Sequence, residues 1–136
     1  MRLSLTVNHE RQHLDPRPGR TLAAALRDHC GLTSPVAGCA DGTCGACTVL
    51  VDDEAVRSCT VLAVQCEGAR VITVEGLAAD DPARQAVADS GRPCDSCRPG
   101  LIMLVAGDKQ ALVDAGRRRR LLASNVCRHA PEMRAD

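Results

Sequence analysis

Four cysteines in the first half of the chain constrain its fold more than any other feature. Their spacing is Cys39-x4-Cys44-x2-Cys47-x11-Cys59. The whole chain has nine cysteines, an odd number, so internal disulfides cannot pair all of them. The N-terminal segment alternates polar and apolar residues and does not resemble a signal peptide, so we expect a cytoplasmic protein with reduced thiols. Cysteine-rich chains of that kind bind metal more often than they form disulfides.

The spacing is that of plant-type [2Fe–2S] sites, with three close ligands and one distant ligand. Two irons and two bridging sulfides need four thiolates, so a tight loop must supply three and a neighbouring strand the fourth. Gly38, Gly42 and Gly45 suit such a loop, because glycine tolerates positive φ and close approach. A structural zinc site is the alternative, although only Cys44-x2-Cys47 fits the usual zinc knuckle.

Composition excludes several other classes of protein. Lys and Arg together number 17, as do Asp and Glu, so the net charge is zero and the chain is not a general polyanion binder. It contains no Phe, Tyr or Trp. Because single-stranded nucleic acids are bound through aromatic stacking, we expect no nucleic-acid partner. No stretch approaches the roughly 20 apolar residues of a membrane helix, so we expect no membrane span.

The first half of the chain has the pattern of a small α+β domain. We expect strands at residues 3–7, 12–16, 48–51, 55–57 and 71–74, with turns at Asn8–Arg11 and Asp52–Asp53. Thr21 is a good N-cap for a helix from Leu22 to Cys30, and Gly31 ends that helix. A short helical piece is expected at residues 61–66.

The second half changes to a helical pattern. Pro82 opens one helix and Pro99-Gly100 another, and two further helical stretches cover residues 109–115 and 117–124. The sequence therefore predicts an α+β domain followed by helices.

Three runs of the sequence are distinctive: the segment from Gly38 to Val49 (GCADGTCGACTV), Val56-Arg57-Ser58-Cys59, and the junction Val74-Glu75-Gly76-Leu77. They resemble the small iron–sulfur subunit of the xanthine oxidase/carbon monoxide dehydrogenase family of molybdenum hydroxylases. The resemblance implies an N-terminal β-grasp, ferredoxin-like domain at residues 1–75. It also implies a C-terminal four-helix domain at residues 77–136 that binds a second [2Fe–2S] cluster.

The second cysteine set matches this resemblance incompletely. Cys94-x2-Cys97 followed by Pro99-Gly100 resembles the family's second cluster motif. The family adds a Cys-x-Cys pair; here Cys127 matches its first cysteine and His129 stands in place of the second. Either His129 ligates iron, or the second cluster is absent, or another group supplies the fourth ligand. Imidazole is an accepted iron ligand and would raise the reduction potential.

The resemblance implies a function in electron transfer and no catalytic residue within the chain. The chain would be the iron–sulfur subunit of a molybdenum-dependent oxidoreductase. It would relay electrons from a molybdopterin-binding large subunit, through two [2Fe–2S] clusters, to an FAD-binding medium subunit in a hetero-oligomer. Molybdopterin and FAD would be held by those partners. The alternatives are a free-standing or single-cluster ferredoxin-type carrier with a degenerate second site, and a redox-sensing module.

The remaining candidate residues favour structural roles. Cys30 and Cys66 lie in apolar patterns and are interpreted as core thiols. His9 and His13 lie near an expected turn and should be solvated. Most of the basic run from Arg117 to Arg120 should also be exposed.

Overall fold

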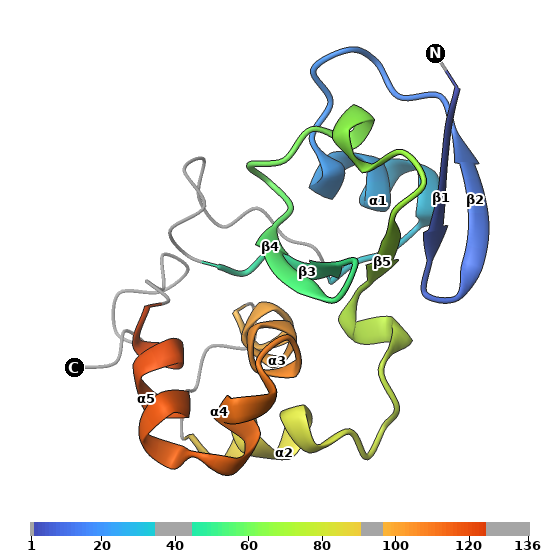
Figure 1. Ribbon diagram of the computed structural model, residues 1–136. Coiled ribbons are helices and arrows are strands. Elements are labelled where there is room, and N and C mark those ends of the chain that lie inside the picture. Colours follow the sequence, from blue (N-terminus) through green and yellow to red (C-terminus); the bar gives the residue numbers. More distant parts are fainter. Residues whose placement is uncertain (1, 35–44, 91–96, 125–136) are drawn as a thin grey trace.

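The computed structural model describes residues 2–34, 45–90 and 97–124, and it is an α+β protein (Figure 1). The elements in chain order are β1 (Leu3–Val7), β2 (Glu10–Leu14), α1 (Leu22–Cys30), β3 (Thr48–Val51), β4 (Glu54–Arg57), η1 (Ala63–Cys66), β5 (Arg70–Ile72), η2 (Val74–Gly76), α2 (Pro82–Asp89), α3 (Arg98–Ala106), α4 (Lys109–Val113) and α5 (Ala115–Ala123). Within these ranges, no helix combines the length and the apolar character needed to cross a membrane.

The strands form one mixed sheet in the order β2-β1-β5-β3-β4. β1 pairs with β5 in parallel, and the other pairs are antiparallel. Alternate residues of β1, namely Leu3, Leu5 and Val7, are buried, as the sequence pattern predicts.

Both hairpins turn through residues with positive φ. Asn8 and His9 have φ values of 49° and 74°, and Asp52 and Asp53 have values of 50° and 73°. Such two-residue turns fit the twist of the flanking strands. The turn at Asp52–Asp53 is confirmed. The prediction of a turn across Asn8–Arg11 was too long, because the two-residue turn lets β2 begin at Glu10 and end at Leu14.

Helix α1 covers one face of the sheet and closes the first hydrophobic core. The Thr21 side chain accepts a hydrogen bond from the Ala24 amide, and Gly31 ends the helix in the left-handed conformation with φ of 68°. Leu22, Ala25 and Leu26 pack against the apolar face of β1 in one buried cluster. The predicted helix and both of its end signals are confirmed.

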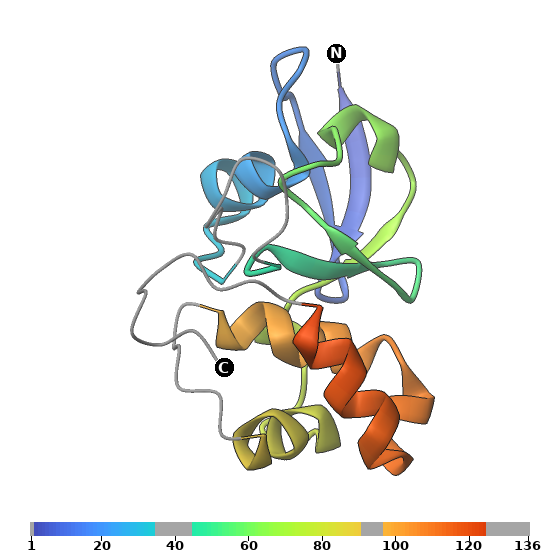
Figure 2. The same cartoon turned by 90° about the vertical axis from the view of Figure 1, so that its left-hand side faces the viewer.

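Helices α2, α3 and α5 enclose a second hydrophobic core. It contains Val87, Leu101, Ile102, Val105 and Leu122 among its buried residues. Val74 and Leu77 pack against it, so the segment that leaves the sheet already belongs to this core. Figure 2 shows these helices below the sheet, with α3 next to the β3–β4 hairpin.

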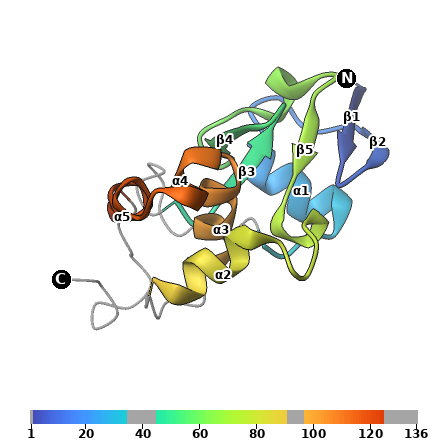
Figure 3. The same ribbon diagram turned by 60° about the horizontal axis from the view of Figure 1, so that its bottom comes forward.

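Helix α3 joins the two cores, because it also contacts β3 and β4. In β3, Val49 belongs to the first core, whereas the neighbouring Leu50 meets Gly107 at the end of α3. The β3 strand is therefore covered on both faces, by α1 and by α3. Figure 3 shows α3 between β3 and α2.

Candidate metal centre

Three of the predicted ligands lie among the described residues: Cys47, Cys59 and Cys97. The predicted ligands Cys39, Cys44, Cys94, Cys127 and His129 lie outside them. Within the described ranges no group of three or more His, Cys, Asp or Glu side chains gathers around one point. The geometry of the site therefore has to be assessed from these three cysteines and the backbone around them.

The structure brings Cys47 and Cys59 together. Their sulfur atoms are 3.0 Å apart, although eleven residues separate them in the chain. Cys47 lies just before β3 and Cys59 just after β4, and the pairing of Thr48 with Arg57 in that hairpin brings the two ends together. The Cys59 backbone N–H also points to the Cys47 sulfur, at 3.3 Å. This arrangement suits thiolate ligands, because a backbone donor stabilises negative charge on sulfur.

Hydroxyl side chains fix the backbone on either side of Cys47. The Ser58 hydroxyl donates to the Cys47 carbonyl oxygen at 2.6 Å, and the Thr48 hydroxyl donates to the Gly45 carbonyl oxygen at 2.7 Å. Ser58 and Thr48 are both buried, and Gly45 has φ of 67°. The predicted need for positive φ at Gly45 is thus confirmed. The roles of Ser58 and Thr48 were not predicted, because a hydroxyl beside a cysteine has no distinctive sequence pattern.

The beginning of α1 holds the segment that carries Cys59. The Ala23 amide donates to the Ser58 carbonyl oxygen at 3.0 Å, and the Leu22 amide donates to the Val61 carbonyl oxygen at 2.7 Å. These amides belong to the first turn of the helix, where no intrahelical acceptor is available. The helix therefore satisfies its own unpaired donors by fixing the loop on which Cys59 lies.

Cys97 lies at the N-cap of α3, the helix that packs against the loop before β3. Its side chain is 1% exposed. One turn later, Gly100 packs so closely on the loop before β3 that an added Cβ would come within 2.1 Å of the Gly45 carbonyl oxygen. Gly45 lies between the predicted ligands Cys44 and Cys47. The backbone of α3 thus makes direct contact with the loop of the first set.

The types of ligand atom at the site are those that an iron–sulfur cluster requires. Thiolates are the usual ligands of such clusters, and Cys47 and Cys59 converge with an N–H directed at one sulfur. At Cys30 and Cys66, which lie outside this set, burial raises the pKa of the thiol, and the charge of Asp52 raises that of Cys66 further. Both pack in the first core, which confirms their interpretation as core thiols.

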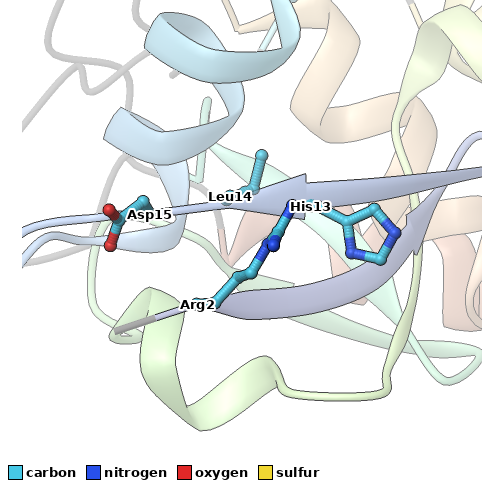
Figure 4. A pocket seen from close by; sticks show the side chains of 4 residues that line it. All are labelled: Arg2, His13, Leu14 and Asp15. Atoms are coloured by element: carbon cyan, nitrogen blue, oxygen red, sulfur yellow. The ribbon is translucent and has the colours of Figure 1, made fainter.

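A hollow at the other edge of the sheet does not contribute to this site. It is lined by Arg2, His13, Leu14 and Asp15 on β1, β2 and their ends (Figure 4). The side chains of His13 and Asp15 extend in different directions and do not meet. Strand β2 and strand β4 are opposite edges of the sheet, so this hollow is remote from Cys47 and Cys59.

Comparisons with known protein families agree with this geometry. Residues 5–78 match the 2Fe-2S iron-sulfur cluster binding domain. This range contains all four cysteines of the first set, so the zinc alternative is not supported there.

Similar proteins extend the match to nearly the whole chain. The 6-hydroxypseudooxynicotine dehydrogenase complex subunit beta of Paenarthrobacter nicotinovorans is 38% identical over 134 residues, with 93% of this chain and 84% of that protein covered. The xanthine dehydrogenase iron-sulfur-binding subunit of Escherichia coli O157:H7 is 40% identical with the same coverage.

A solved structure shows the same fold. Quinoline 2-oxidoreductase from Pseudomonas putida 86 superposes with a TM-score of 0.83 at 32% identity, over 96% of this chain and 85% of the matched chain. The alternative of a free-standing carrier is not favoured, because the matched relatives are subunits of multi-subunit complexes. The chain belongs to the small [2Fe–2S] iron–sulfur subunits of the molybdenum hydroxylases, and it is an electron-transfer subunit of a hetero-oligomeric oxidoreductase.

Proposed function

We propose that this subunit binds two [2Fe–2S] clusters, one on each side of the contact between α3 and the loop before β3. The first set of ligands is Cys39, Cys44, Cys47 and Cys59; the second is Cys94, Cys97, Cys127 and His129. In this proposal residues 1–75 form a β-grasp domain and residues 77–136 form a four-helix domain. The reduced thiols that both sets require fit a cytoplasmic location.

The convergence of Cys47 and Cys59 is the observation that carries the proposal. The two sulfur atoms are 3.0 Å apart, with a backbone N–H at 3.3 Å from one of them, and would supply two of the four thiolates. Cys97, which belongs to the helical core at the start of α3, is assigned to the second site because of its motif Cys94-x2-Cys97 rather than because of its burial. The contact of Gly100 with Gly45 supports close placement of the two sites.

The chain's own residues would set how readily each site is reduced. A [2Fe–2S] cluster, when bound, takes up and releases single electrons. The Cys59 N–H would favour the more negative, reduced form, because it would stabilise charge on the Cys47 sulfur. His129, as a neutral ligand in place of a thiolate, would favour reduction at the second site. The subunit would then connect a molybdopterin-binding large subunit to an FAD-binding medium subunit.

The test of the metal sites is a count of iron and acid-labile sulfide in the purified chain. We expect about four irons per chain, two for each [2Fe–2S] cluster. Cys59→Ala should abolish one paramagnetic signal of the reduced protein, and His129→Ala should change the other. Cys30→Ala is the matched control, because Cys30 is a core thiol outside both sets. About two irons per chain, with His129→Ala silent, would contradict the second cluster.

The test of the partners is purification of the tagged chain from its own cells. We expect it to be recovered with a molybdenum-containing large subunit and a flavin-containing subunit in fixed ratio. Recovery of a stable, isolated chain that carries both clusters would contradict the proposed partners and leave the metal sites standing.

A further inference from the structure

Glu75 bridges two segments that are distant in the sequence. Its Oε2 atom accepts hydrogen bonds from the backbone amides of Thr33 at 3.2 Å and Ser34 at 3.1 Å. Its Oε1 atom accepts from the hydroxyl of Ser34 and, at 2.7 Å, from the hydroxyl of Thr73. One carboxylate therefore receives four donors, and three of them come from the segment 33–34.

Hydrogen bonds between Thr73 and Asn8 fix the segment before Glu75 to the sheet. Thr73 is 0% exposed, and its amide donates to the Asn8 side-chain oxygen at 2.8 Å. The Asn8 side-chain nitrogen donates in turn to the Thr73 hydroxyl at 2.9 Å. An added Cβ at Gly76 would come within 2.2 Å of the Asn8 side-chain oxygen, so the junction packs tightly on the β1–β2 turn. Glu75 thus extends from a fixed point of the fold.

The helical side of the junction is held as well. The Arg84 guanidinium of α2 donates to the carbonyl oxygens of Val74 at 2.8 Å, Leu77 at 3.1 Å and Ala78 at 2.8 Å. The segment around Glu75 is therefore fixed by contacts from both parts of the molecule.

The segment that Glu75 holds leads directly to the first cysteine set. Ser34 immediately precedes residues 35–44, which carry Cys39 and Cys44. We propose that Glu75 is a positioning residue: it holds Thr33 and Ser34, which precede the ligand-bearing segment in the sequence, against the junction between the two parts of the chain. This inference rests on the proposed role of Cys39 and Cys44 as cluster ligands.

A carboxylate that served only solubility would not make these contacts. Glu75 is exposed, yet both of its oxygens are used by donors of the same molecule. Burial alone would raise the pKa of Glu75, but the hydrogen bonds from Ser34 and Thr73 outweigh it and lower the pKa. Glu67 offers a comparison, because its side chain accepts a hydrogen bond from the Ser4 amide of β1 at 2.8 Å, in the sheet rather than at residues 33–34.

The experiment uses the full chain with its clusters and compares Glu75→Ala, Glu75→Gln and Ser34→Ala, with Glu67→Ala as control. The readouts are the paramagnetic spectrum and midpoint potential of the first cluster, and the rate at which a chelator removes its iron. For Glu75→Ala we expect a broadened spectrum and about threefold faster iron loss, because partly exposed hydrogen bonds to a charged group are each of modest strength. Removal of a negative charge should also raise the potential.

The other variants separate position from charge. Ser34→Ala keeps the charge and removes one donor, so it should accelerate iron loss without raising the potential. Combined with Glu75→Ala it should add nothing further, because both changes break the same contact. Glu75→Gln, which keeps an acceptor, should raise the potential but retain most of the resistance to the chelator.

Two outcomes would overturn the inference in distinguishable ways. If the unmodified chain gave no signal from a first cluster, the proposed function and this inference would both fail. If that signal were normal and Glu75→Ala and Ser34→Ala matched Glu67→Ala in spectrum and iron loss, only the role of Glu75 would fail.

Discussion

Gly100 occupies the point where the helical part of the molecule meets the first cysteine loop. An added Cβ there would come within 2.1 Å of the Gly45 carbonyl oxygen and 2.8 Å of the Ala46 backbone. Neither partner is a flexible side chain, so the contact cannot be relieved by a rotamer change. The residue after Pro99 must therefore be glycine if α3 is to keep this position.

Gly100→Ala should destabilise the chain by about 1–3 kcal/mol, the usual cost of overpacking. It should also alter the spectrum of the first cluster, although residue 100 follows Cys97, a proposed ligand of the second. Denaturant unfolding and paramagnetic spectroscopy are the measurements. Gly116→Ala in α5 is the control, because its nearest neighbours are 3.4 Å away, and it should be neutral or stabilising by up to about 1 kcal/mol. Equal effects of the two substitutions would contradict the proposed contact.

The pKa of the Glu75 carboxylate should lie below the ordinary glutamate value, because of the hydrogen bonds that it accepts from Ser34 and Thr73. Because its folded pKa is lowered, its contribution to stability is present above the ordinary glutamate pKa and is lost as the pH falls through the lower folded value. Ser34→Ala removes one of the responsible donors and should move the pKa of Glu75 upward. Carbon NMR of the side-chain carboxyl groups, recorded against pH for the unmodified chain and for Ser34→Ala, measures this. An unchanged titration of Glu75 in Ser34→Ala would show that Ser34 does not stabilise the charge.

Among the elements, α4 and α5 meet at a corner built from polar contacts. The Asp108 carboxylate caps α4 by accepting from the amides of Gln110 and Ala111, at 3.1 and 3.3 Å. It also accepts from the Arg117 side chain of α5 at 2.9 Å. Arg118 donates to the Ala111 carbonyl oxygen at 2.8 Å, near the end of α4. Part of the basic run, expected to be mostly solvated, thus joins the two helices.

Asp108→Ala should cost about 1–2 kcal/mol, because it removes the cap and the partner of Arg117. Asp108→Asn should cost less, since an asparagine side chain still caps the helix. Unfolding followed by circular dichroism is the measurement. Asp89→Ala is the control: it removes only the exposed contact with Gln85 and should change stability by less than about 0.5 kcal/mol. An Asn variant as unstable as the Ala variant would show that the ion pair, rather than the cap, dominates.

The sequence predicts helices and strands well where neighbouring residues determine their ends or their buried face. Thr21 and Gly31 determine the ends of α1, and the alternation of Leu3, Leu5 and Val7 determines the buried face of β1. Strand β2 was misplaced by two residues, because its polar residues give little periodicity and the backbone of Asn8 and His9 decides its register. Of the candidate site, the meeting of Cys47 and Cys59 was predicted from spacing. The supporting hydroxyls depend on tertiary contacts that spacing does not encode.

At the scale of the molecule, the two cores are joined through the two faces of β3. The sequence Thr-Val-Leu-Val is apolar at consecutive positions, a pattern typical of a strand buried on both faces. The sequence indicates the strand. It does not indicate which element packs on the second face of the strand, because that element is α3, some fifty residues later. Val49 and Val51 pack on the first core, whereas Leu50, 8% exposed, meets the end of α3. We therefore expect the two parts to unfold together.

Leu50→Ala should break this cooperativity. It removes the side chain that lies against Gly107 and should cost about 2–3 kcal/mol, within the range for a large-to-small change in a core. Because the lost contact joins the two cores, loss of the first cluster's absorbance and loss of helical circular dichroism should separate into distinct transitions on heating. Val51→Ala, on the opposite face of the same strand, should lower the midpoint and keep the transitions coincident. Coincident transitions in Leu50→Ala would contradict this role of Leu50 and assign the coupling to the other contacts between the two parts, among them that of Gly100 with Gly45.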